Sequence, residues 1–229
     1  MGYNYEYPRP SVTVDAVVFG YQERELRVLL IERGEDPCRG AWALPGGFVQ
    51  VDEDLGDAAK RELEEETGIQ PLLLEQLGAF GTPGRDPRGH TITVAFVAIV
   101  KLEDHNARAA TDAADARWFP ANDPPELAFD HNEILEAARR HMIEAVRTRP
   151  VGFDLLPKRF TQTQLQILLE SILGEELDKR NFRKKLQSLD LLIPTGKYET
   201  GVARRAAQLY RFDAAHYRRL LKDGFQFRL

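Results

Sequence analysis

Apolar residues gather in short runs along the first part of the chain. Valine, alanine and phenylalanine dominate residues 12–19, and a second apolar run covers residues 26–31 after a polar turn at residues 21–25. Residues 72–80 and 91–102 form further runs, of which the second is dense in β-branched and aromatic side chains. Short runs separated by turn residues predict β-strands, and the first two runs predict a hairpin.

Two segments of the same part repeat their apolar residues at helical spacing. One follows Asp54 and places Leu55, Ala59 and Leu63 on a common side, and the other covers residues 132–147. Strands mixed with two helices predict an α/β fold in which the helices sandwich a sheet.

The last part of the chain predicts two helices joined by a short turn. Thr161 and Gln164 have the spacing of a capping box, apolar residues then recur at helical spacing from 165 to 173, and Gly174 is placed to end the helix. Asp178 is placed to cap the second helix.

The second of these helices has one apolar and one basic face. Phe182, Leu186 and Leu189 share the apolar side, and the basic stripe lies opposite. The residues of this helix that we expect to contact DNA are Lys179, Arg180, Asn181, Arg183, Lys184 and Gln187.

A β-hairpin is predicted after the second helix. Its strands are residues 193–198 and 207–212, with Arg204 and Arg205 near its basic tip. Two helices and a hairpin in this order predict a winged helix-turn-helix domain, whose second helix enters the major groove of double-stranded DNA while the wing approaches phosphates. A module that only packs or dimerises is the alternative.

The charge changes sign near Pro150. Residues 1–150 contain 16 basic and 27 acidic residues, a net charge of −11, whereas residues 151–229 contain 15 basic and 9 acidic residues, a net charge of +6. A basic segment in an otherwise acidic chain attracts polyanions, which favours DNA binding over the packing alternative. We therefore predict two domains, residues 1–150 and 151–229, joined by a linker at residues 150–157.

Composition excludes several classes of protein. Apolar residues make up 43% of the 229 residues and charged residues 29%, which is typical of a globular chain. The sequence has no apolar run of the roughly 18 residues that cross a bilayer, and residues 1–10 do not resemble a signal peptide, so we expect a cytoplasmic protein with no membrane partner. Cys38 is the only cysteine, which excludes an intrachain disulfide and a zinc site built from cysteines.

The strongest chemical motif lies between Gly47 and Ile69. This segment reads GFVQVDEDLGDAAKRELEEETGI and fits the pattern G-x5-E-x7-R-E-U-x-E-E-x-G-U, where U is aliphatic. The fixed positions are Gly47, Glu53, Arg61, Glu62, Leu63, Glu65, Glu66, Gly68 and Ile69. From average residue usage, the Gly, Glu and Arg positions agree by chance in fewer than roughly one window in ten million.

The glutamates of the motif fall on one face of the predicted helix. With about 3.6 residues per turn, Glu62, Glu65 and Glu66 lie together, and such like charges call for a counter-charge. Mg²⁺, or Mn²⁺, is suited to this because it takes carboxylate and phosphate oxygens together. A bound metal would neutralise a diphosphate and acidify a water, one glutamate would remain as base, and Arg61 would orient a carboxylate. An exposed acidic helix that ends at Gly68 is the alternative.

The motif resembles the Nudix box, and the preceding sequence WALPGG at residues 42–47 is typical of that superfamily. The resemblance implies an αβα sandwich with a mixed sheet over about residues 10–149, and hydrolysis of a nucleoside diphosphate linked to another group. The metal ligands that it implies are Glu62, Glu65, Glu66 and the Gly46 carbonyl. Glu53 is expected outside the direct ligands, and the box leaves open which glutamate is the base. The catalytic set is thus Glu53, Arg61, Glu62, Glu65 and Glu66.

The loop GTPGRDPRGH at residues 81–90 resembles the segment that faces the ligand in Nudix members that handle ADP-ribose and related nucleotides. Arg85 and Arg88 are either phosphate contacts or solvated side chains of a polar loop. The ligand contacts that we predict are Arg33, Gly46, Gly47, Arg85 and Arg88.

Nearly the whole chain resembles Nudix-related transcriptional regulators, through residues 5–10, 127–131 and 177–185 above all. In that family a homodimer binds a palindromic operator, and ADP-ribose or a related metabolite alters the DNA affinity. Several of these regulators have a degraded box and do not hydrolyse their ligand, whereas this box is complete. Two functions therefore stay open: a metabolite-sensing regulator, with or without hydrolysis, and an ADP-ribose pyrophosphatase whose C-terminal domain serves dimerisation.

Overall fold

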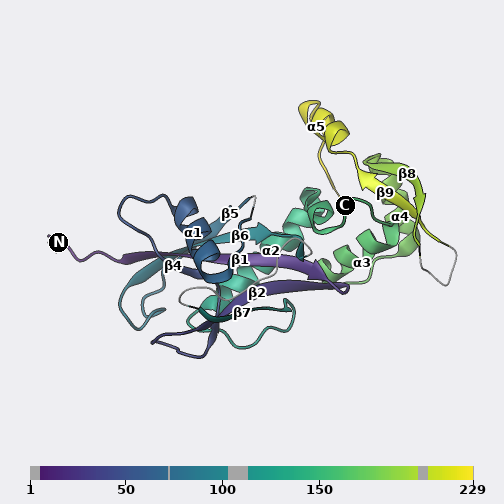
Figure 1. The fold of residues 1–229 in the computed structure, drawn as a ribbon. Coiled ribbons are helices and arrows are strands. Elements are labelled where there is room, and N and C mark those ends of the chain that lie inside the picture. Colours follow the sequence, from purple (N-terminus) through teal and green to yellow (C-terminus); the bar gives the residue numbers. More distant parts are fainter. Residues whose placement is uncertain (1–5, 72, 103–112, 201–205, 229) are drawn as a thin grey trace. The chain divides into compact units, whose positions relative to one another are not determined.

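The computed structural model describes residues 6–71, 73–102, 113–200 and 206–228, and Figure 1 labels its elements. Contacts divide the chain into two compact units: Met1–Gly20 with Arg27–Ala138, and Tyr21–Leu26 with Arg139–Leu229. The second half of the helix that precedes Pro150 is therefore grouped with the C-terminal unit. The sequence-based boundary of the folding domains at Pro150 stays a prediction.

The N-terminal unit is built on a mixed sheet, which has seven strands in the described part of the chain. The strands are β1 (Ser11–Gln22), β2 (Glu25–Arg33), β3 (Trp42–Ala43), β4 (Gly46–Phe48), β5 (Glu75–Phe80), β6 (Thr91–Ile99) and β7 (Ala113–Pro120). Their order is β3-β2-β1-β6-β5, with β4 beside β1 and β7 beside β2. β1 and β6 are parallel, whereas β4, β5 and β7 pair antiparallel with their neighbours. The predicted mixed sheet and the adjacency of the first two strands are confirmed.

Helix α1 (Leu55–Thr67) packs its apolar side on this sheet. The Asp54 side chain caps its first turn, and Gly68 ends it in the left-handed conformation with a φ of 70°. Leu63 is fully buried in a core cluster with residues of β1, β2 and β6. Burial of such a side chain contributes about 2 kcal/mol. Leu63 therefore stabilises the packing of this helix on the sheet.

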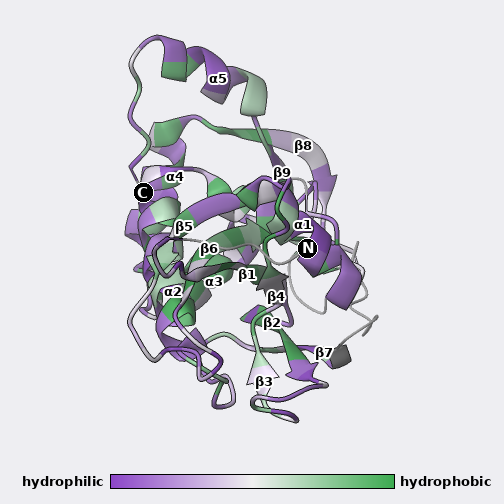
Figure 2. Cartoon of the chain, turned by 90° about the vertical axis from the view of Figure 1, so that its left-hand side faces the viewer, coloured by the Kyte–Doolittle hydropathy of each residue, from purple (hydrophilic) through white to green (hydrophobic). Residues whose placement is uncertain are grey.

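Helix α2 (His131–Thr148) belongs to the N-terminal unit with its first half, as far as Ala138. Its buried residues Ile134, Leu135, Ala138 and Met142 follow the predicted spacing. The two views together place the first half of α2 on the face of the sheet opposite α1, with the largely hydrophobic strands β1 and β6 between them (Figures 1 and 2). This arrangement confirms the predicted sandwich.

The C-terminal unit contains the predicted helix pair and hairpin. Its elements after α2 are a 3-10 helix η2 (Val151–Leu155), α3 (Gln162–Leu173), α4 (Lys179–Leu189), β8 (Leu192–Tyr198), β9 (Gln208–Phe212) and α5 (Ala214–Lys222). The capping box at Thr161, the glycine end at Gly174 and the Asp178 cap are all present. In the described ranges, no helix is long and apolar enough to cross a membrane.

Several features of the fold differ from the sequence-based expectations. The predicted linker contains η2, and its Leu155 and Leu156 are buried, because an apolar pair of this size is stabilised by packing rather than by solvation. The short strands β3 and β4, the alanine-rich strand β7 and helix α5 were not predicted. α5 follows the Asp213 cap, and its Tyr217 packs against a core cluster with Phe227.

We expect the Thr161→Ala variant to be about 1 kcal/mol less stable than the wild type. The Thr161 hydroxyl accepts the Gln164 N–H at 3.1 Å, and the Gln164 side chain accepts the Thr161 N–H at 2.7 Å, so alanine leaves an amide of the first turn without its partner. Urea unfolding monitored by circular dichroism measures the change. Thr161→Ser keeps the hydroxyl and is the control; equal loss in both variants would contradict the capping role.

Candidate functional site

The glutamates of the motif occupy one side of α1, as their spacing predicts. The carboxylate of Glu66 is buried, and it accepts a hydrogen bond from the Gly46 N–H at 2.8 Å. Glu62 is largely buried, with a side chain that is 16% exposed, whereas the Glu65 side chain is 50% exposed. The solvent exposure of these carboxylates thus increases from Glu66 to Glu62 to Glu65. All three lie beside the loop that contains Gly46 and Gly47.

Arg61 connects this set through its guanidinium group. Its Nε and Nη2 atoms bind both oxygens of Glu53, at 2.7 and 2.8 Å. Its Nη1 atom donates to Glu62 at 2.8 Å and to Glu65 at 3.1 Å. The hydrogen bonds from Arg61 hold the pKa of Glu53 below its ordinary value. Glu53 therefore holds the guanidinium group of Arg61 in place, and Arg61 orients the carboxylates of Glu62 and Glu65.

Burial changes the acidity of the inner glutamates. Loss of hydration raises the pKa of Glu66 to about 8, although the Gly46 N–H acts in the opposite direction. Burial also raises the pKa of Glu62, against the effect of its hydrogen bond from Arg61. Both groups bind a proton more readily than an exposed glutamate, and a nearby cation would reverse this by stabilising their charged forms.

The donor set suits a hard divalent cation, because carboxylate oxygens are the ligands that such ions prefer. Nudix hydrolases use a divalent metal. Among the described residues, however, no group of three or more His, Cys, Asp or Glu side chains is already arranged to hold one. Arg61 supplies counter-charge to Glu62 and Glu65. Binding of Mg²⁺ or Mn²⁺ at this face stays a prediction. The Gly46 contact seen here is through its N–H, and ligation by its carbonyl stays a prediction.

Gly46 and Gly47 bring the loop against the helix. A Cβ atom on Gly46 would lie 2.1 Å from the Val14 carbonyl oxygen, and one on Gly47 would lie 2.5 Å from the carboxylate of Glu62. Both distances are far below van der Waals contact. The Gly46 contact is with backbone, so any other residue there would push β4 away from β1. The Gly47 contact is with the end of the Glu62 side chain, so a larger residue there would displace this carboxylate.

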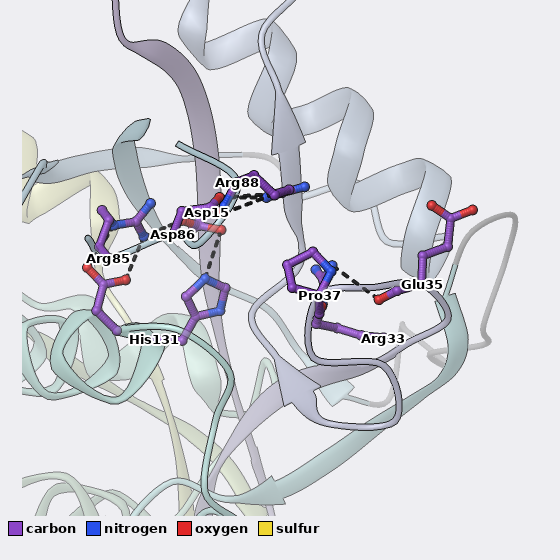
Figure 3. Close-up of polar contacts among 9 residues, drawn as sticks. Asp15, Arg33, Glu35, Pro37, Arg85, Asp86, Arg88 and His131 are labelled. Carbon is purple, nitrogen blue, oxygen red and sulfur yellow. Dashed lines mark hydrogen bonds and ion pairs between the residues drawn. The ribbon is translucent and has the colours of Figure 1, made fainter. Parts of the chain in front are cut away.

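A small cavity of about 70 Å³ lies beside these glycines. It is lined by Thr13, Asp15, Arg33, Leu44, Gly46, Gly47, Phe48, Arg85, Asp86, Arg88, Phe129 and His131. The structure therefore brings together all of the predicted ligand contacts, and Figure 3 shows how their polar partners approach the arginines.

Arg85 is held by acidic residues. Its Nε and Nη2 atoms bind both carboxylate oxygens of Asp130, at 2.7 and 2.6 Å, and its side chain is only 5% exposed. Asp15 lies 3.8 Å away on β1. The alternative that Arg85 is a solvated side chain is therefore wrong. Its ion pair with Asp130 holds it in the wall of the cavity (Figure 3).

Arg88 and Arg33 are positioned by stacking as well as by hydrogen bonds. Arg88 binds the buried carboxylate of Asp86 at 2.7 Å, and its guanidinium lies 4.9 Å from the ring centre of Phe48. Arg33 lies 4.9 Å from the ring centre of Phe129 and donates to the Pro37 carbonyl at 2.8 Å. Hydrogen bonds from Arg88 hold the pKa of Asp86 below its ordinary value.

The sequence interpretation did not assign roles to the acidic partners or to the histidine of this cavity. His131 Nδ1 accepts the Leu44 N–H at 3.0 Å, and its Nε2 lies 3.6 Å from Asp15. Burial lowers the pKa of His131, although the charge of Asp15 opposes this. A polar Asp15 in an otherwise apolar strand was a signal, since a buried carboxylate requires a partner. The contacts of Asp130 and His131 span distant parts of the chain, so no local sequence pattern predicts them.

The second candidate site is the exposed face of α4. An open hollow of about 800 Å³ is lined by Asp178, Lys179, Arg180, Asn181, Arg183, Lys184 and Gln187. The opposite side of the helix is buried, through Phe182, Leu186 and Leu189. The predicted apolar and basic faces of this helix are therefore confirmed. Arg204 and Arg205 of the predicted wing lie outside the described residues.

Both parts of the chain match known domain families. Residues 9–146 match the NUDIX domain, and residues 152–212 match the NrtR DNA-binding winged helix domain. The ADPR responsive transcriptional repressor NtrR of Acinetobacter baylyi is 35% identical over 93% of this chain and 86% of its own length. An ADP-ribose pyrophosphatase of Methanocaldococcus jannaschii is 41% identical over 57% of this chain and 73% of its own.

NrtR of Shewanella oneidensis is similar in structure. Its complex with a 27mer DNA matches 94% of this chain and 97% of that chain at 34% identity, with a TM-score of 0.77. Its NUDIX domain complexed with ADP ribose matches 60% of this chain and 94% of that chain at 36% identity, with a TM-score of 0.55. The chain therefore belongs to the NrtR family, in which a NUDIX domain precedes an NrtR DNA-binding winged helix domain.

Proposed function

We propose that this protein is a metabolite-sensing DNA-binding transcriptional regulator whose Nudix domain binds ADP-ribose or a related nucleotide. The observation that carries the proposal is the face of α4, where the basic residues expected to contact DNA are exposed side by side. Family membership over nearly the whole chain supports it, since the relatives named above respond to ADP-ribose or bind DNA.

In this proposal α4 lies in the major groove of double-stranded DNA. Arg180, Arg183 and Lys184 extend from its exposed face, and an arginine in this place reads guanine through two hydrogen bonds. Arg204 and Arg205 of the wing contact phosphates. A homodimer presents the set twice, which suits a palindromic operator. Such a regulator acts where the DNA is, in the cytoplasm.

The arginine-lined cavity binds the nucleotide. Arg33, Arg85 and Arg88 are suited to a diphosphate, because guanidinium groups bind phosphate oxygens through paired, charge-assisted hydrogen bonds. A cavity of about 70 Å³ would hold only part of a nucleotide, since ligand pockets usually measure roughly 300 Å³ or more. Coupling of the ligand to DNA requires that the nucleotide bind the DNA-binding state and the released state of the protein with different affinities.

Retained hydrolysis is the second candidate function, and the complete box together with the likeness to a pyrophosphatase favours it. Glu62, Glu65, Glu66 and the Gly46 carbonyl would hold Mg²⁺ or Mn²⁺. Bound there, the metal would supply charge neutralisation of the diphosphate and acidification of a water. Arg61 keeps Glu62 and Glu65 oriented. The box leaves open which of its glutamates would accept the proton of the water. In the alternative in which the protein is a pyrophosphatase and not a regulator, the winged helix domain serves only dimerisation.

We expect the Glu62→Gln/Glu66→Gln double variant to bind Mn²⁺ at least about 10- to 100-fold more weakly than the wild type. Removal of both inner carboxylates takes away the charges that attract the cation, while the amides keep the side-chain shape. Calorimetric titration with the metal alone measures the affinity. Glu64→Gln is the control, because Glu64 is exposed on the other side of the same helix. Unchanged affinity in the double variant would show that the metal site is elsewhere.

We expect any hydrolysis to be faster with ADP-ribose than with a nucleoside triphosphate such as dGTP. The cavity offers three arginines for a diphosphate, and two of them, Arg85 and Arg88, are already paired with Asp130 and Asp86, so little positive charge remains for a third phosphate. Chromatographic separation of each substrate from its nucleoside monophosphate product measures both rates at equal concentrations. A faster reaction with dGTP would reject this substrate class.

We expect Arg183→Ala to weaken binding to the preferred operator by about 1–3 kcal/mol and to have a smaller effect on random DNA, if Arg183 reads a guanine. For the wild type, log affinity should fall with log salt by roughly 0.9 per phosphate contacted. Selection from randomised duplexes followed by gel shifts gives the site and the affinities. Lys60→Ala removes a positive charge from α1 and is the control. If no motif is enriched at low salt without ligand, the regulator function is rejected and the hydrolase function remains.

A further inference from the structure

Phe129 has a backbone conformation that is rare for a bulky side chain. Its φ is 57°, in the left-handed region that bulky residues rarely adopt. Glu23 and Arg24 share this conformation in the tight turn between β1 and β2, and Asp190 shares it at the end of α4. Phe129 also lies in a local turn, in which the His131 N–H donates to the Ala128 carbonyl at 3.2 Å. Unlike those charged residues, it is aromatic and lines a cavity. A strained residue that lines a cavity indicates a functional constraint.

The strained conformation places the ring of Phe129 against both stacked arginines of the cavity. The guanidinium of Arg33 lies 4.9 Å from the ring centre, and that of Arg88 lies 5.7 Å from it. Arg33 comes from β2 and Arg88 from the loop before β6, so the ring is a shared contact of two distant segments. Two positive charges near each other repel, and the negative face of an aromatic ring offsets part of this cost.

The hydrogen bonds of both arginines leave the same atom available. Arg33 donates from Nε and Nη2 to the carbonyls of Pro37 and Glu35, and Arg88 donates from Nε and Nη2 to Asp86. Among the described residues, Nη1 of either arginine has no hydrogen bond in the structure. A guanidinium that is fixed by stacking on one side and by hydrogen bonds on another loses less freedom when a ligand binds.

We propose that Phe129 is a positioning residue, which holds Arg33 and Arg88 so that both guanidinium groups meet the diphosphate of one nucleotide. This inference rests on the proposed function of the cavity and adds to it the residue that prepares it for a ligand with two phosphates. A ligand with one phosphate needs only one of the two arginines, and it therefore depends less on their relative placement.

A purely structural role of Phe129 makes a different forecast. The ring also packs against the core cluster of Ile31, Ala43 and Ala128. Leucine retains apolar volume for this packing but has no aromatic face, whereas tyrosine retains the face. Phe129→Leu and Phe129→Tyr therefore separate stacking on the arginines from packing in the core.

The test is calorimetric titration of the full chain in Mg²⁺ buffer with two ligands. One is an ADP-ribose analogue whose phosphates are bridged by a methylene group, so that this bond is not hydrolysed, and the other is AMP. We expect Phe129→Leu to weaken binding of the analogue about tenfold, to change AMP binding much less, and to be restored by Phe129→Tyr. Phe119→Leu is the control, because Phe119 pairs with Trp42 and does not line the cavity.

Each outcome decides between the claims. Equal weakening of both ligands, or no rescue by tyrosine, would overturn the positioning role and leave a packing role. Unchanged binding of the analogue to Phe129→Leu would overturn it as well, while wild-type binding would still support the proposed function. A wild-type protein that does not bind the analogue would remove both the positioning role and the ligand assignment. Thermal unfolding of each variant identifies any loss that comes from stability alone.

Discussion

The close approach of strand β4 to helix α1 is the constraint on which both faces of the Nudix domain depend. Gly46 has no room for a side chain against the backbone of β1, and a side chain on Gly47 would displace the carboxylate of Glu62. The Gly46 N–H then reaches the buried carboxylate of Glu66, and the following Phe48 lies beside Arg88. One short strand therefore fixes the inner glutamate on one side and the wall of the arginine-lined cavity on the other.

Arginine–carboxylate pairing organises both sites in the same way. Arg61 binds Glu53, Glu62 and Glu65, which offsets the repulsion of carboxylates gathered on one helix face. In the neighbouring cavity, Asp130 and Asp86 bind Arg85 and Arg88. Buried ion pairs of this kind contribute little net stability, because desolvation offsets much of their attraction. Their benefit is the fixed orientation of groups that bind charged ligands.

Local patterns in the sequence predicted what depends on near neighbours. The capping residues of α1, α3 and α4, the buried face of α4 and the shared side of the motif glutamates follow from spacing alone. Contacts across long distances in the chain could not be predicted, such as Arg85 with Asp130 or Leu44 with His131. β7 was missed because its alanine-rich sequence has little β propensity, and its pairing with β2 supplies the stability that the local sequence lacks.

Charge balance links the two sites of the Nudix domain. Asp86 and Asp130 neutralise Arg88 and Arg85, whereas Arg33 binds carbonyl groups and forms no ion pair with a described residue. A nucleotide diphosphate carries more negative charge than one arginine offsets, so a cation on the adjacent carboxylates would complete the neutralisation. In the proposed regulator, the glutamates of the box would then raise ligand affinity whether or not the ligand is cleaved. A complete box is therefore compatible with sensing as well as with catalysis.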